Sequence, residues 1–251
     1  MTADPTPIPA ATVVIFRDRA GAPPDLLMVE RSATMAFAGG AMVFPGGRID
    51  SGDQALAAEL GLDDEDGPGR IAAVRESIEE AGVAPGVTPG DAATIMRLRA
   101  LLHGGTTIGA ALEAVGATLD PEALVPFSRW LPLGMRARIF DTLFYLARMP
   151  DGAPEPIVDA TENSRLVWTT AAAMLAEADA GRAQIIFPTR RNLERLALFD
   201  DYAAAVAHAR AHDIRAITPW FEDRGGVRHL CIPDDQGYPV TAEPADTVRR
   251  A

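Results

Sequence analysis

Cysteine, positive charge and long apolar runs are all scarce in this sequence. Cys231 is its one cysteine, so no intrachain disulfide can form, and we expect it to pack in a reducing, cytoplasmic environment. Lys and Arg number 23 against 35 Asp and Glu, and the net charge of −12 offers no general attraction for long nucleic acid or an anionic membrane. No apolar run reaches the ~18 residues of a transmembrane helix, so we expect no membrane partner.

Targeting signals and several common catalytic motifs are missing as well. The first residues lack the basic-then-apolar order of a secretory signal, and the last ones, VRRA, are no peroxisomal address. There is no G-x-S-x-G or Walker pattern. His208 and His212 lie four residues apart, but Ala209 stands where a zincin-type helix needs glutamate. We therefore expect a structural role for all four histidines, which are His103, His208, His212 and His229.

The most informative stretch is the segment 69–83, GRIAAVRESIEEAGV. Its apolar residues recur at three- and four-residue steps and therefore share one helical face, and Gly82 is a natural stop. Glu76, Glu79 and Glu80, here called the acidic cluster, lie on another face, where such neighbours are about 5–6 Å apart at Cβ. A solvated acidic face is one interpretation of this cluster. A site for Mg²⁺ or Mn²⁺, which prefer carboxylate oxygens, is the other.

The segment before this helix favours the metal site. In Ala41–Asp53, AMVFPGGRIDSGD, a short apolar run enters a Pro-Gly-Gly turn. Glycine lets the backbone bend tightly and approach a ligand closely. A glycine turn and an acidic helix that arrive together predict an oxygen-lined cation pocket.

The two segments together resemble the signature of the Nudix hydrolases, G-x5-E-x7-R-E-U-x-E-E-x-G-U, with U apolar. Gly47 matches the first glycine, and Arg75 through Val83 match the second half. Asp53 replaces the first glutamate, and Ser77 occupies an apolar position. The residues between Asp53 and Arg75 number 21 instead of 7, which is an insertion of 14.

The resemblance implies hydrolysis of a nucleoside diphosphate linked to another group, with Mg²⁺ or Mn²⁺ as cofactor. It assigns metal binding to the acidic cluster and the Gly46 carbonyl, catalysis to Glu79 and Glu80, and an orienting role to Arg75. A general base is expected just before the last core strand. Glu162, six residues before Trp168, is our candidate, Asp159 is the second, and a solvated loop carboxylate remains the alternative.

Arginines are the expected phosphate ligands, because guanidinium forks match phosphate oxygens. The candidates are Arg31, Arg48, Arg190 and Arg191, with Arg195 nearby. A helix that starts near Thr189 would add free N–H groups for an anion. Each of these arginines could instead serve only solubility.

Upstream, the segment 27–47 resembles a pattern of Nudix enzymes that cleave coenzyme A, with Arg31, Ser32, Gly40 and Phe44 in register and Ala36 in place of a second arginine. The split signature is similar to that of the coenzyme A diphosphatase branch with an interrupted Nudix box. Hydrolysis of coenzyme A or acyl-coenzyme A is therefore the first hypothesis. The alternatives are hydrolysis of dinucleotides, ADP-ribose or capped nucleotides, and a non-catalytic ligand sensor.

Strands that alternate with helices predict an α/β sandwich, and the resemblance implies the Nudix fold, a mixed β-sheet between helices. We expect a flexible tail at 1–10, a Nudix domain at 11–200 and a C-terminal extension at 201–251, with a hairpin around Gly225-Gly226 and a mobile chain from Thr241 onward. The domain would hold an insertion at 54–69 and a helical insert at about 86–120, which either caps the substrate pocket or only adds bulk. By analogy with the family, a homodimer remains open.

Overall fold

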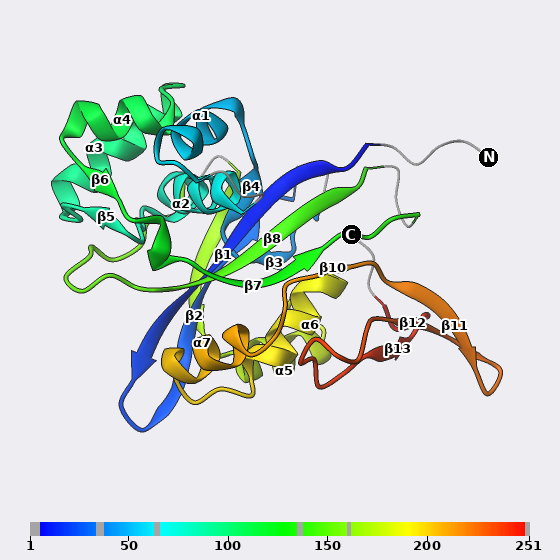
Figure 1. The fold of residues 1–251 in the computed structure, drawn as a ribbon. Helices are drawn as coiled ribbons and strands as arrows, with labels where there is room; N and C mark the ends of the chain where they lie inside the picture. Colours follow the sequence, from blue (N-terminus) through cyan, green and yellow to red (C-terminus); the bar gives the residue numbers. More distant parts are fainter. Residues whose placement is uncertain (1–5, 34–37, 63–65, 135–137, 160–161, 249–251) are drawn as a thin grey trace.

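The core of the protein is a mixed β-sheet, seen in a computed structural model that describes residues 6–33, 38–62, 66–134, 138–159 and 162–248 (Figure 1). Its strands run in the order β10-β7-β8-β1-β2-β3, with β4 on β1 and β9 on β2. β1 is parallel to β8 and β10 to β7, whereas the other pairs are antiparallel. The bounds are β1 Ile8–Arg19, β2 Ala22–Arg31, β3 Met42–Val43, β4 Gly46–Arg48, β7 Val125–Trp130, β8 Phe140–Arg148, β9 Asn163–Thr169 and β10 Ala216–Ile217.

Helices cover both faces of this sheet (Figure 1). One layer holds α1 Ser51–Glu59, α2 Gly67–Ala81, α3 Ala92–His103 and α4 Ile108–Val115; the other holds α5 Ala171–Asp179, α6 Phe187–Leu196 and α7 Tyr202–Arg210. Side chains alternate along β1, so Val13 and Ile15 pack in one core while Val14 and Phe16 pack in the other. This explains the uninterrupted apolar run of the strand and confirms the predicted α/β sandwich.

The helical insert belongs to the first core. It consists of β5 Val87–Thr88, α3, α4, β6 Thr118–Leu119 and a short 3₁₀ helix at Pro121–Ala123. Leu98, Leu102, Ile108 and Leu112 are buried with the apolar face of α2. The insert therefore packs into the helical layer and shares its core with α2.

The C-terminal extension forms a second, three-stranded sheet of β11 Trp220–Arg224, β12 Val227–Cys231 and β13 Ala242–Pro244. The predicted hairpin at Gly225-Gly226 is confirmed, and both glycines have the positive φ that such a turn needs, 63° and 82°. We expected a mobile chain from Thr241 onward, which is wrong for β13. It pairs with β12 through the backbone.

Several boundaries differ from expectation. β1 begins at Ile8, so residues 8–10 belong to the sheet and not to a flexible tail, while 1–5 lie outside the described residues. α6 begins at Phe187 with Ile186 at its N-cap, so Thr189 is not the cap. Pro188 explains the earlier start. Proline lacks a backbone N–H, and the N–H groups of the first helical turn have no partner within the helix, so proline is well suited to this turn. Within the described ranges, no helix is long and apolar enough to cross a membrane.

His208 packs in a polar pocket between α6 and α7. Its Nδ1 accepts a hydrogen bond of 3.3 Å from Arg195, whose guanidinium also donates to the Phe127 carbonyl at 2.9 Å. The ring of His212 stacks on it at 4.4 Å. Burial lowers the pKa of His208 to about 4, and the charges of Arg195 and His212 act in the same direction. The fold therefore holds this histidine neutral, in agreement with a structural role.

We predict that this histidine makes the fold weaker in acid. Because the unfolded chain binds a proton near pH 6.5 and the folded chain only near pH 4, His208 costs stability as the pH falls through that window. His208→Gln should flatten the decline in the free energy of unfolding between pH 7 and pH 4, measured by urea denaturation. His103→Gln, at an exposed position, is the matched control. An equally steep decline in H208Q and wild type would contradict the assignment.

Candidate active site

Helix α2 presents the acidic cluster because its other face is anchored in the core. Ile71, Val74 and Ile78 are fully buried, and Gly82 ends the helix with φ at 67°. Ser77, at a position where the signature has an apolar residue, is also fully buried, and its hydroxyl donates to the Val83 carbonyl at 2.8 Å. The helix thus tolerates the substitution, since the buried hydroxyl has a partner.

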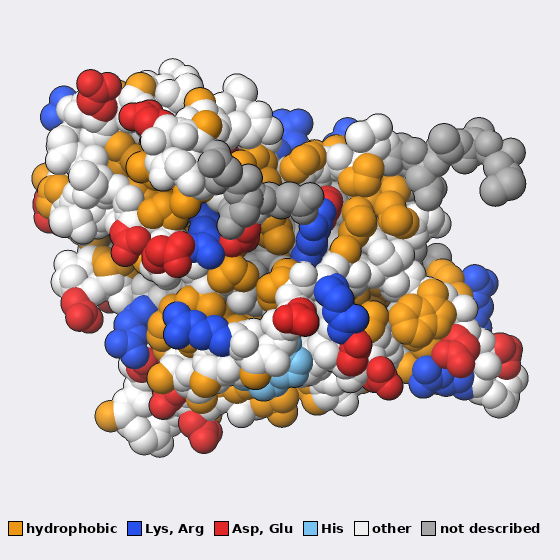
Figure 2. Space-filling model, viewed as in Figure 1, with side chains coloured by type: hydrophobic (Ala, Val, Ile, Leu, Met, Phe, Trp, Pro, Cys, Tyr) orange, Lys and Arg blue, Asp and Glu red, His pale blue; other side chains and the backbone are white. Residues whose placement is uncertain are grey.

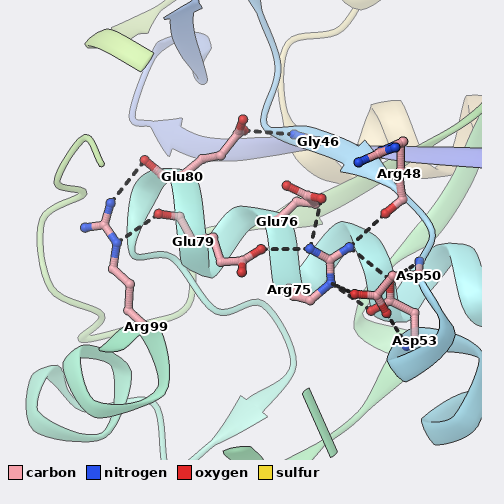
Figure 3. Close-up of polar contacts among 9 residues, drawn as sticks. All are labelled: Gly46, Arg48, Asp50, Asp53, Arg75, Glu76, Glu79, Glu80 and Arg99. Carbon is pink, nitrogen blue, oxygen red and sulfur yellow. Dashed lines mark hydrogen bonds and ion pairs between the residues drawn. The ribbon is translucent and has the colours of Figure 1, made fainter. Parts of the chain in front are cut away.

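Arg75 is the centre of the polar contacts in Figure 3. Its Nε and Nη2 form a fork on Asp53, at 2.9 and 3.0 Å, and Nη2 also donates to the Arg48 carbonyl at 2.8 Å. Its Nη1 donates to Glu76 Oε1 at 2.9 Å and to Glu79 Oε2 at 2.7 Å. Burial alone would lower the pKa of Arg75, but the hydrogen bond to Asp53 and the surrounding carboxylates raise it. The guanidinium is therefore held charged beside the cluster.

Asp53 lies in the interior, on the side of Arg75 away from the acidic cluster (Figure 3). It is fully buried, and burial raises its pKa while Arg75 opposes the shift. Asp53 and Asp50 also form a capping box at the start of α1, each accepting the other's backbone N–H at 2.9 Å. Asp53 is thus a partner of Arg75 and a helix cap, and it does not line the cleft.

The Gly46-Gly47 segment of β4 lies directly against the cluster. The N–H of Gly46 donates to Glu80 Oε2 at 3.0 Å. A Cβ on Gly47 would lie 2.2 Å from Glu76 Oε1, so a side chain there would displace the Glu76 carboxylate. The glycine pair is therefore required by close approach, as the sequence predicted.

Burial makes the charged forms of Glu76 and Glu80 costly. Burial raises the pKa of Glu76 to about 7, with Glu79 adding to the shift and Arg75 opposing it. Burial and then the charge of Glu76 raise the pKa of Glu80 to about 8, against the Gly46 N–H and the charge of Arg31. A bound cation would offset this cost with its positive charge.

The residues present fit a divalent cation by their chemistry. Arg75 engages one oxygen of Glu76 and one of Glu79, and Gly46 engages one of Glu80, which leaves Glu76 Oε2, Glu79 Oε1 and Glu80 Oε1 as donors. Within the part of the chain that the structure describes, no three His, Cys, Asp or Glu side chains already surround a point that could hold an ion. Binding therefore requires the glutamate side chains to turn, which their flexible stems on one helix edge permit.

A cleft of about 1250 Å³ runs along this edge of α2. Its polar wall includes the acidic cluster together with Arg31, Arg48, Asp159 and Glu162. Its apolar wall includes six aromatic residues, which are Phe44, Trp130, Phe140, Phe144, Phe187 and Phe221. On the face shown in Figure 2, charged side chains meet hydrophobic ones between the α1–α4 layer and the C-terminal hairpin.

The loop before β9 brings both candidate bases to the cleft. The backbone carbonyl of Glu162 accepts from the N–H of Ser32 at 2.7 Å, which ties this loop to β2. The Asp159 carboxylate accepts the backbone N–H groups of Glu162 and Asn163 at 3.2 and 3.1 Å. Asp159 thus shapes the turn, while Glu162 has an exposed side chain in the cleft wall.

Comparisons with known proteins agree with this geometry. No family model matches the chain. A Caenorhabditis elegans protein named "Putative nudix hydrolase 7" is 30% identical over 183 residues, which are 70% of this chain and 57% of that protein. The chain thus spans a little over half the length of this curated relative. The crystal structure of a NUDIX hydrolase from Alicyclobacillus acidocaldarius is 28% identical and superimposes with a TM-score of 0.70 over 82% of this chain and 97% of the other.

The chain is thus similar in sequence to two Nudix proteins and shares the fold of one of them. The mixed sheet between two helical layers is accordingly the Nudix fold, as the sequence predicted.

Two arginines that the sequence predicted as substrate ligands are engaged elsewhere. Arg191 is 1% exposed and pairs with Glu194 at 2.8 Å and Glu243 at 2.9 Å. Arg190 pairs with Asp179 at 2.6 Å and lines a separate cavity of about 220 Å³. Neither is among the described residues that line the cleft, so the structure does not bring them to the acidic cluster and their role at the substrate stays a prediction. The reason is that β13 and α5 supply acidic partners that the local sequence does not reveal.

Sequence reasoning also missed two features of this candidate site. Asn163 is 1% exposed and lies near the Glu80 carboxylate, whose pKa it lowers. Arg99, from the helical insert, donates to the backbone of the acidic cluster. Only the position of Arg99 beside the apolar face of its helix hinted that it points inward.

We predict that Gly47→Ala separates stability from function. The Cβ would push against the flexible end of Glu76, so the fold should persist while the carboxylate is displaced. Mn²⁺ affinity, measured by calorimetry, should fall at least about 10-fold with the melting temperature nearly unchanged. Gly109→Ala is the control, because its Cβ would meet Leu56 at an ordinary 3.6 Å. Unchanged Mn²⁺ affinity in G47A would show that Glu76 is not a ligand.

Proposed function

We propose that this chain is a divalent-cation-dependent pyrophosphohydrolase that cleaves the diphosphate linkage of a small nucleotide derivative. The observation that carries the proposal is the convergence of the acidic cluster, the glycine bend of β4 and the Arg31 and Arg48 side chains on one cleft.

The chain's own residues would divide the work as follows. The acidic cluster and the Gly46 carbonyl would hold Mg²⁺ or Mn²⁺, which neutralises developing charge on the diphosphate and acidifies water. Arg31 and Arg48 line the same cleft and would bind phosphate oxygens through their guanidinium forks. A carboxylate oxygen of Glu162 would take the proton from the attacking water.

Coenzyme A, or its acyl derivatives, is the substrate we favour. Arg31 and Phe44, two residues of the coenzyme A pattern, both line the cleft. Ser32, a third, holds the backbone of Glu162. The aromatic wall offers an apolar surface on which the pantetheine or acyl arm of such a substrate could lie. Dinucleotides, ADP-ribose and capped nucleotides share the diphosphate and are the competing substrates.

The substrate assignment predicts which compound is cleaved fastest. With Mn²⁺ present, the protein should convert coenzyme A to phosphopantetheine and adenosine 3′,5′-bisphosphate with a higher kcat/KM than for ADP-ribose, NADH or a dinucleoside polyphosphate. Mass spectrometry of products formed in ¹⁸O-water would also identify the phosphorus that water attacks. If coenzyme A stays intact while another diphosphate is cleaved, the substrate is wrong and the hydrolase assignment stands.

Substitution of Glu79 separates an enzyme from a sensor. Glu79→Gln keeps the size of the side chain and removes its charge, so a hydrolase should lose about three orders of magnitude in kcat/KM, which corresponds to about 4 kcal/mol of transition-state stabilisation. Glu113→Gln, at an exposed position on α4, should retain wild-type activity. Wild-type protein that binds coenzyme A without turnover, with equal affinity in E79Q, would instead identify a sensor.

A further inference from the structure

Arg99 reaches from the helical insert to the end of the acidic helix. Its Nε donates to the backbone carbonyl of Glu79 at 2.9 Å, and its Nη2 donates to that of Glu80 at 3.4 Å (Figure 3). The side chain also packs beside Gly82, where a Cβ would lie 3.6 Å from Nη1. One guanidinium thus binds the backbone of two residues of the acidic cluster.

These contacts complete the hydrogen bonding of the last turn of α2. The final carbonyls of a helix have no partner within it and must be satisfied from outside. Arg99 takes those of Glu79 and Glu80, and the N–H of Ile157 donates to that of Ala81 at 2.9 Å. A cation at this end is also favoured by the helix dipole. Removal of Arg99 would leave two carbonyls of the functional turn without these partners.

The insert contacts the other end of the helix as well. Arg70, in the first turns of α2, donates to the Pro121 carbonyl at 3.3 Å and pairs with Glu122, both in the 3₁₀ helix of the insert. The insert therefore binds α2 near its start and at its end. This arrangement resists rotation or fraying of the helix that carries the acidic cluster.

Asp159, in the loop that holds the candidate base, acts on Arg99 through its charge. Burial lowers the pKa of Arg99, and the negative charge of Asp159 opposes that shift. The Asp159 carboxylate also accepts the backbone N–H of Glu162 at 3.2 Å.

We propose that Arg99 is a positioning residue, which fixes the last turn of α2 so that Glu79 and Glu80 present their carboxylates to a divalent cation in the cleft. The helical insert is then a brace for the metal-binding helix. This inference rests on the proposed function, because it concerns the same cation. The two carbonyls belong to successive residues of α2 and accept from different nitrogens of Arg99. The guanidinium of arginine can donate to both at once, which suits this geometry better than the single ammonium of lysine.

The test compares Arg99→Gln and Arg99→Lys with Arg97→Gln, which changes an exposed arginine of the same helix. Mn²⁺ binding is followed by the electron paramagnetic resonance signal of the free ion, and kcat and KM are measured with the preferred diphosphate. R99Q should weaken Mn²⁺ binding about 10-fold and lower kcat, because outer contacts that orient ligands have effects of this size. R99K should recover part of the affinity, and R97Q should match wild type.

A purely structural role predicts a different result. R99Q would then melt at a lower temperature, yet at a temperature where it is folded it would bind Mn²⁺ and turn over like wild type, which overturns the inference alone. If R99Q does not fold, the comparison is made with R99K. Wild-type Mn²⁺ affinity together with an unchanged kcat in R99K would then contradict the positioning role. Wild-type protein that binds no Mn²⁺ overturns the proposed function together with the inference.

Discussion

The ion pair between Arg75 and Asp53 joins the two halves of the site. Asp53 is fully buried and Arg75 is 8% exposed, so neither charge is well solvated without the other. Removal of one partner from such a pair costs about 3–5 kcal/mol, because it leaves the other charge buried and unpaired. The same guanidinium holds the Arg48 carbonyl and two members of the acidic cluster. The glycine bend, α1 and α2 are therefore tied together at one point.

This ion pair joins two residues that 21 others separate along the chain. Asp53 belongs to α1, and α1 packs along α2, so the chain returns before the second half of the signature begins. The extra residues form the rest of α1 and the segment that leads to α2. Asp53 lies in the first turn of α1, where its carboxylate accepts from Arg75 and also from the backbone N–H of Asp50. An aspartate therefore serves at this position. Separation along the chain is thus no measure of separation in the site.

The features that were predictable depend on local spacing. Glu76, Glu79 and Glu80 share one edge of a helix whatever surrounds it (Figure 3). The alternation of strand-like and helix-like segments likewise predicted the sandwich. The glycine bend was predictable because glycine has few other reasons to occur twice after Phe44-Pro45.

The features that the sequence did not reveal depend on contacts distant in sequence. Arg191 was expected at the substrate, but its partner Glu243 lies 52 residues further along the chain. β13 was expected to be mobile because no local pattern announces that it pairs with β12. The contact of Arg99 with α2 joins the insert to the acidic helix, and the sequence contained no sign of this pairing. Each case concerns which surface a charged or extended residue meets, and tertiary packing decides that.

The most direct test of the account is the position of the cation. Crystals grown with Mn²⁺ and a non-hydrolysable diphosphate should show anomalous density bonded to carboxylate oxygens of Glu76, Glu79 and Glu80, with Asp53 still holding Arg75. Ordered Mn²⁺ density elsewhere on the molecule, or a site in which Arg75 bridges Glu76 and Glu79 and no cation binds at saturating Mn²⁺, would contradict it.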